Sequence, residues 1–197
     1  DDPEGLGLEL TVVETSDAPL VAQHPEIPAE HALQGFDGVR AFAADPSASR
    51  ELFEQTLGFL PAGDGAWEAR GATRGGFYVF DAPPASGPGV PGAGTVHHVA
   101  FASNMDEQDA WLDAVRAAGR NPSGVIDRFW FRSIYFREPS GVLFEIATMG
   151  PGFSVDEERE HLGEKLILPP AFEHLRAQVE PLLTPLPDTR ASWPTRV

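Results

Sequence analysis

The sequence repeats its own pattern at an interval of 60 residues. One unit opens with Asp37-Gly38-Val39 and the next with His97-His98-Val99, and each opening is followed by a helix-like segment and several short strand-like segments. Internal repeats of this kind indicate duplicated modules, which bury their sheet faces against their neighbours. We therefore expect two copies of one strand–helix–strand–strand–strand (βαβββ) module.

The first unit carries start and stop signals for its helix. Asp45 and Pro46 suit the N-cap and the first helical position, and Gly58 suits the end of the helix. The apolar residues between them share one helical face, and the segments that follow have strand composition. The predicted elements are a strand at 35–43, a helix at 47–57, and strands at 67–70 and 76–81.

The second unit follows the same plan. Its helix presents Trp111, Leu112 and Val115 on one side, and Gly119 suits a helix C-cap. The strand-like segments after it are rich in aromatic and β-branched residues. The predicted elements are a strand at 96–102, a helix at 106–118, and strands at 124–126, 129–136 and 142–148.

The first residues of the chain resemble the end of such a module. Residues 2–9 and 138–145 share one order: an acid, Pro, any residue and Gly, then three residues and Glu. Proline and glycine at these positions suit a tight turn that leads into a strand. We interpret residues 1–13 as the last strand of a preceding module that is otherwise absent. The alternative is a native amino-terminal strand.

These patterns predict an α+β fold in which repeated βαβββ modules form cupped mixed sheets, followed by a helical C-terminal tail. Pro- and Gly-rich stretches mark the boundaries between the units. The expected division is a terminal strand at 1–13, a linker at 14–34, a module without a metal ligand at 35–82, a Pro/Gly linker at 83–94, a module with the metal site at 95–150, and the tail at 151–197.

Composition excludes several classes of function. The chain has no cysteine, which rules out disulfides, thiolate zinc sites and thiol nucleophiles, and leaves His, Asp and Glu as strong metal ligands. A formal charge of −16 disfavours nucleic acid and anionic membrane surfaces as partners. The sequence shows no leader and no apolar run long enough to span a membrane, so we expect a cytoplasmic protein.

Two polar residues stand among small and apolar neighbours at the two ends of the second unit. In a regular strand His98 would share its face with Ala100, and Glu145 would share its face with Leu143, while His97 would point away from His98. An unpaired carboxylate in such surroundings is costly. Two interpretations remain open from the residues alone: hydrogen-bonded strand residues, or ligands of a divalent metal.

Three segments carry a resemblance to a known family. GTVHHVAFAS, DRFWFRSIYFREPSGVLFEIAT and LGEKLILPP resemble the hydroquinone-type ring-cleaving dioxygenases of the vicinal oxygen chelate superfamily. That superfamily also includes glyoxalase I, fosfomycin and bleomycin resistance proteins, and extradiol dioxygenases. The resemblance implies an oxidoreductase that opens an aromatic ring with O₂ in the degradation of aromatic compounds.

The resemblance also implies a site. Its metal is Fe(II), with Mn(II) as the alternative, and it is held by two histidines and one glutamate. His98 and Glu145 match two of these three ligands. His97 matches a neighbouring histidine that acts on the substrate or on oxygen intermediates. Arg128 and Tyr135 stand where the family places an arginine and a tyrosine near the substrate.

The chain departs from this pattern at the third ligand, because Asp37-Gly38 offers no histidine in the first unit. We expect the missing ligand to come from a missing N-terminal module or from another chain of a homo-oligomer. Two alternative functions remain: a glyoxalase-like, metal-dependent isomerase or transferase, and a non-catalytic module that binds an aromatic compound or a drug. The expected partners are a small aromatic substrate and O₂, with no nucleic acid and no membrane.

Overall fold

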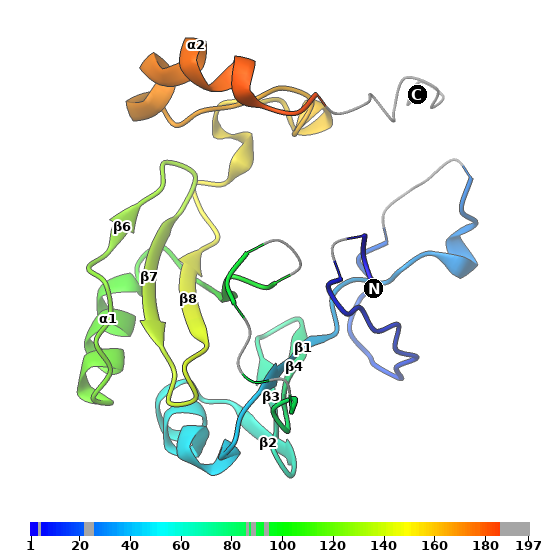
Figure 1. Ribbon diagram of the computed structural model, residues 1–197, viewed down its shortest axis with the longest axis vertical. Coiled ribbons are helices and arrows are strands. Elements are labelled where there is room, and N and C mark those ends of the chain that lie inside the picture. Colours follow the sequence, from blue (N-terminus) through cyan, green and yellow to red (C-terminus); the bar gives the residue numbers. More distant parts are fainter. Residues whose placement is uncertain (4, 22–25, 86, 88–89, 93–94, 186–197) are drawn as a thin grey trace.

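The computed structural model describes residues 1–3, 5–21, 26–85, 87, 90–92 and 95–185. Two four-stranded mixed sheets dominate it, and they follow each other along the chain (Figure 1). The α+β fold class and the duplication predicted from the 60-residue repeat are confirmed. The final residues of the predicted tail, 186–197, lie outside the described part of the chain, as do several residues of both predicted linkers.

The first sheet has the strand order β1-β4-β3-β2. Its outer strand β1 runs parallel to β4, and the remaining pairs are antiparallel. The strands are β1 (Gly38–Phe42), β2 (Leu60–Gly63), β3 (Ala66–Arg70) and β4 (Gly75–Asp81).

The second sheet repeats this order as β5-β8-β7-β6, again with one parallel pair, β5 and β8. Helix α1 packs against β7 and β8, as Figure 1 shows. The elements are β5 (Val99–Ser103), α1 (Gln108–Ala117), β6 (Ile126–Asp127), β7 (Arg132–Arg137) and β8 (Leu143–Thr148).

One hydrophobic core serves both modules. The fully buried ring of Phe53, from the first module, stacks on Phe144 of β8 with centroids 5.7 Å apart. Phe53 also meets Trp67 at 5.0 Å and Tyr78 at 5.3 Å within its own module. The two sheets therefore share apolar contacts that neither module could bury alone.

The helix predicted at 47–57 is irregular. It begins as a 3₁₀ turn, η2 (Pro46–Ser49), whose N-cap Asp45 accepts a hydrogen bond from the backbone of Ser47 at 3.0 Å, and it continues as a π-helical turn, η3 (Leu52–Thr56). Gly58 follows with a φ of 70°, which explains why glycine stands there. Strand β2 was missed because its sequence, Leu-Pro-Ala-Gly, lacks strand composition.

The predicted helical C-terminal tail is present as one continuous helical stretch at 170–182, formed by η6 (Pro170–Leu175), α2 (Arg176–Val179) and η7 (Glu180–Leu182) in succession. The acidic segment after Ser154 forms no α-helix, and α2 spans four residues. The other short turns are η4 (Phe153–Val155) and η5 (Arg159–His161), with η1 (Ala29–His31) in the first linker.

Residues 1–3 and 5–13 form no strand in the structure. A strand needs a neighbouring strand for its backbone hydrogen bonds, and these residues pair with none of the described strands. Their assignment as the last strand of a preceding module stays a prediction. No helix among the described residues has the length and apolar character needed to cross a membrane.

Candidate functional site

Glu145 lies in the middle of β8, between Ala100 of β5 and Tyr135 of β7. Its neighbours along the strand, Phe144 and Ile146, point into the shared core, so strand alternation turns Glu145 to the opposite face. The residue is nevertheless only 4% exposed. A carboxylate this deeply buried requires hydrogen-bond donors or a cation.

Three side chains supply those contacts. The Nε2 atom of His98 lies 2.7 Å from Oε2 of Glu145. The hydroxyl of Tyr135 donates to Oε1 at 2.7 Å, and the hydroxyl of Ser133 donates to the same oxygen. The structure thus brings His98 and Glu145, which lie far apart in the sequence, into direct contact. The parallel pairing of β5 with β8 makes this contact possible.

His97 lies beside His98 and does not point away from it. Their Nδ1 atoms are 2.9 Å apart and their rings are nearly perpendicular, at 89°. The expectation from strand alternation was wrong because β5 begins at Val99. Both histidines precede the ladder, so alternation does not govern their directions. A neutral His98 that donates from Nε2 to Glu145 must accept at Nδ1, which makes His97 the donor.

Arg128 lies over the ring of Tyr135, with its guanidinium carbon 5.4 Å from the ring centre. A tight turn places it there: the backbone of Arg128 donates to Phe131 O, and the backbone of Phe129 donates to the side chain of Asp127, each at 2.8 Å. Phe129 has a φ of 75°, a conformation that non-glycine residues seldom adopt. The turn therefore holds a cation beside the phenol.

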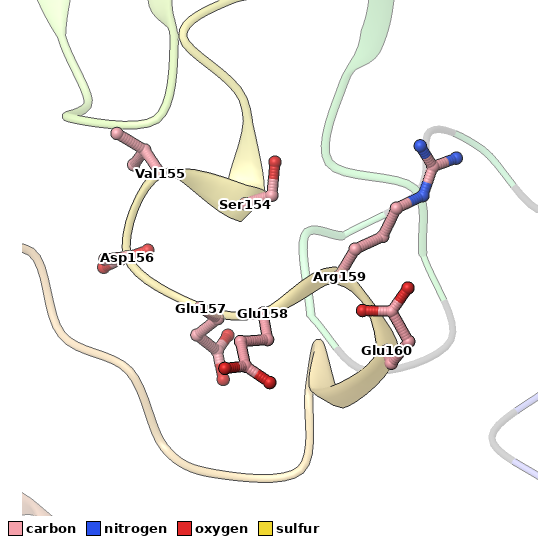
Figure 2. A pocket seen from close by; sticks show the side chains of 7 residues that line it. All are labelled: Ser154, Val155, Asp156, Glu157, Glu158, Arg159 and Glu160. Carbon is pink, nitrogen blue, oxygen red and sulfur yellow. The ribbon is translucent and has the colours of Figure 1, made fainter.

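The beginning of the tail supports this turn. Asp156 accepts a hydrogen bond from the indole of Trp130 at 2.9 Å, and Gly152 donates to the carbonyl of Trp130 at 2.8 Å. Figure 2 shows the loop of residues 154–160, whose side chains line a shallow hollow of their own. The loop therefore stabilises the turn that carries Arg128 through the bond between Asp156 and Trp130. The hollow that the loop lines includes none of the predicted site residues.

Ser133 is the site residue that the sequence interpretation missed. A signal for it exists, because Ser133 and Tyr135 are two residues apart on β7 and therefore share a face. Ser133 pairs with Ala147, diagonally from Glu145, so its contact with the carboxylate could be recognised only once the register was known.

Among the described residues, the first module has no comparable site. Arg40 is the counterpart of Ala100 in the 60-residue repeat. Arg40 pairs with Val79, and Ala100 pairs with Glu145, so Val79 occupies the position of Glu145. By the same register Ala66 takes the place of Tyr135. That this module lacks a metal ligand stays a prediction, and the register shows which residues stand in place of Glu145 and Tyr135.

Two side chains of the second module, His98 and Glu145, are of the types that bind a divalent cation. An imidazole nitrogen and a carboxylate oxygen that touch each other are ligands that iron, manganese and zinc accept. Within the described residues, no three His, Cys, Asp or Glu side chains come together as a potential metal site. The chemistry of the pair fits two ligands of a divalent cation, and a complete set would need a further donor.

Comparison with known proteins shows the family to which the chain belongs. The family model described as the glyoxalase/bleomycin resistance protein/dioxygenase superfamily matches residues 35–146, which cover the first module and the second as far as Ile146 in β8. The chain belongs to this superfamily. The resemblance stated from the sequence is confirmed at this level.

Three relatives illustrate the likeness. MhqO of Bacillus subtilis (strain 168), provisionally named a ring-cleaving dioxygenase, is 38% identical over 94% of this chain and 60% of its own length. The chlorohydroquinone/hydroquinone 1,2-dioxygenase of Sphingobium indicum is 30% identical over 89% of this chain and 57% of its own length. The crystal structure of a provisionally named dioxygenase from Bacillus subtilis matches with a TM-score of 0.83 and 36% identity, over 95% of this chain and 61% of that one. The chain therefore spans about three fifths of the length of these relatives.

Proposed function

We propose that the protein that carries this chain is a metal-dependent, extradiol-type dioxygenase that opens a hydroquinone- or catechol-like ring with O₂. One observation carries the proposal: His98 and Glu145 touch at 2.7 Å, with Tyr135 and Arg128 beside them. The names of the relatives support the reaction class, since one is a chlorohydroquinone/hydroquinone 1,2-dioxygenase and others are provisionally named ring-cleaving dioxygenases.

In this proposal His98 Nε2 and Glu145 Oε2 are two ligands of Fe(II), with Mn(II) as the alternative. The bound cation would supply Lewis acidity and a route for electrons between a phenolate and O₂. The third ligand comes from the rest of the protein or from a second chain. The other carboxylate oxygen, Oε1, accepts hydrogen bonds from Tyr135 and Ser133.

His97 acts as the proton carrier. When Nε2 of His98 serves as a ligand, its proton resides on Nδ1, and Nδ1 of His97, 2.9 Å away, accepts it in a hydrogen bond. A neutral His97 then carries its own proton on Nε2. Because His97 is exposed, this nitrogen can exchange a proton with a substrate hydroxyl or with water.

Arg128 and Tyr135 prepare the substrate side. The guanidinium of Arg128 forms no ion pair with a carboxylate among the described residues, so its charge is available to a substrate phenolate or a developing anion. Tyr135 is a proton donor whose hydroxyl rests on Glu145 in this structure. The phenol can turn to the substrate only by leaving that carboxylate, because it has a single proton to donate.

Oxygen consumption tests the proposal. The full-length protein, loaded with Fe(II) under anaerobic conditions, should consume O₂ with hydroquinone, chlorohydroquinone or catechol and form a ring-opened product. Glu145→Ala and His98→Ala should abolish uptake together with bound iron, while His97→Gln and Tyr135→Phe should retain iron and slow turnover by about 10²–10⁴-fold.

Other outcomes distinguish the two alternatives. Turnover with Zn(II) and without O₂ would indicate an isomerase or transferase. Tight binding of an aromatic compound that survives chelation and Glu145→Ala would indicate a binding module. No O₂ uptake with any of these substrates would reject the proposal.

A further inference from the structure

The Oε1 atom of Glu145 receives two hydroxyl hydrogen bonds, from Ser133 and from Tyr135. Under the proposed function, Tyr135 must release this oxygen when it donates to the substrate. A carboxylate oxygen that is almost fully buried loses stabilisation when it loses a donor, and its side chain is then free to rotate. A second donor that stays in place removes this difficulty.

Ser133 meets the requirements for that donor. Its side chain is fully buried, so it cannot reach a substrate. Its backbone is fixed on both sides, because Ser133 pairs with Ile126 of β6 and with Ala147 of β8. A hydroxyl on a central strand that is paired on both sides keeps its place when a neighbouring phenol moves.

We propose that Ser133 is a positioning residue that holds Oε1 of Glu145, so that Oε2 remains presented beside His98 while Tyr135 is released for the substrate. This inference rests on the proposed function, since it concerns Glu145 as a ligand. Ser133 and Tyr135 then have separate tasks, although both donate to the same oxygen. Ser133 maintains the affinity for the cation, and Tyr135 serves turnover.

The chain contains a matched control. Ser49, also fully buried, donates to Oε2 of the buried Glu138 at 2.5 Å, and Glu138 also accepts the backbone N–H groups of Ser140 and Val142 at 2.8 Å. This pair joins the first module to the turn between β7 and β8. Ser49→Ala therefore removes the same kind of bond as Ser133→Ala at a place that does not touch the candidate ligands.

The test measures equilibrium binding of Mn(II) to the full-length protein by electron paramagnetic resonance of the free ion. Outer-shell partners of metal ligands typically change metal affinity by about 10–100-fold, and we expect this loss for Ser133→Ala. Ser49→Ala should bind Mn(II) within about twofold of the unaltered protein, since its partner is not a ligand. Tyr135→Phe should retain affinity within about threefold while turnover falls.

A second pair of variants guards against a folding defect. Ser133→Thr keeps the hydroxyl and Ser133→Val lacks it, and the two side chains have nearly the same volume. Any steric cost is therefore common to both, and only the valine variant should lose the 10–100-fold in affinity.

The outcomes separate the two proposals. Equal Mn(II) affinity in the threonine and valine variants, or in Ser133→Ala and the unaltered protein, would overturn the positioning role alone. An equal loss in Ser49→Ala and Ser133→Ala would overturn it as well, because the effect would then be one of general stability. Absence of both Mn(II) binding and anaerobic Fe(II) binding by the unaltered protein would overturn the proposed function, and the role of Ser133 with it.

Discussion

Replacing Glu145 with leucine tests whether the hydrogen-bonded network serves function or holds the fold together. The substitution removes the acceptor of three donors, of which only Ser133 is fully buried. An orphaned buried donor costs about 1–3 kcal/mol, whereas His98 and Tyr135 retain some access to water and lose less. We expect Glu145→Leu to lower the free energy of unfolding by about 2–4 kcal/mol.

A triple variant removes the two hydroxyl donors together with the acceptor and leaves His98, whose side chain has access to water. Ser133→Ala and Tyr135→Phe, added to Glu145→Leu, leave an apolar patch in place of the network. Replacing a buried polar network with apolar groups of similar volume is often neutral or stabilising. The first module already places Val79 and Ala66 at the matching positions of a sheet with the same strand order. We expect the triple variant to unfold within about 1 kcal/mol of the unaltered protein.

Thermal unfolding followed by circular dichroism, in the presence of a chelator, measures both variants without a contribution from bound cation. For a chain of this length, the loss expected for Glu145→Leu lowers the Tm by roughly 5–15 °C. The triple variant should recover most of this decrease. A triple variant less stable than the single one would refute the reasoning, because the network would then be a structural element rather than a functional site.

Two further predictions concern the core and one concerns the first linker. Burial and the charge of Glu138 raise the pKa of Tyr78 far above its usual value, so absorbance at 295 nm should show Tyr78 still protonated in the folded protein at a pH where a free tyrosine ionises. Because the folded-state pKa is the higher one, stability should fall above about pH 10, where the unfolded state ionises, and Tyr78→Phe should remove this slope in urea titrations. Phe53→Ala should cost about 3–5 kcal/mol and loosen both sheets in one transition, whereas two separate transitions would contradict a shared core. The hydrogen bond from Arg70 lowers the pKa of Asp17. This contact therefore stabilises the folded state above about pH 4 and is lost as the pH falls. Because Asp17→Asn lacks the charged contact at every pH, its acid unfolding should begin at the same pH as that of the unaltered protein or at a higher one.

The order of the elements could be predicted because their signals are local. The helix of the second module has an apolar face and a glycine at its end, and α1 lies within the predicted bounds, with Val115 fully buried. The repeat then made the topology predictable, since both copies must pair their strands alike. The proximity of His98 and Glu145 follows, because the first and last strands of a module are parallel neighbours.

The details of the site depend on information that is not local. The partnership of Ser133 with Glu145 requires the register of β7 against β8, and a shift of one residue would place the hydroxyl on the core side. The contact between His97 and His98 depends on where β5 begins, and strand ends are the least predictable feature of a sequence. The irregular helix of the first module was hidden for a similar reason, since the apolar residues of an α-helix and of a π-turn follow nearly the same spacing.

The shared core explains how a module without ligands contributes to the site. Phe144 and Glu145 are neighbours on β8, and their side chains project from opposite faces of the sheet. The ring of Phe53 packs on Phe144, so the first module fixes the position of the strand from which the carboxylate projects. A module can therefore lack Glu145 and Tyr135 equivalents and still be required for the geometry of the site, because interiors packed this closely transmit displacements from one face of a sheet to the other.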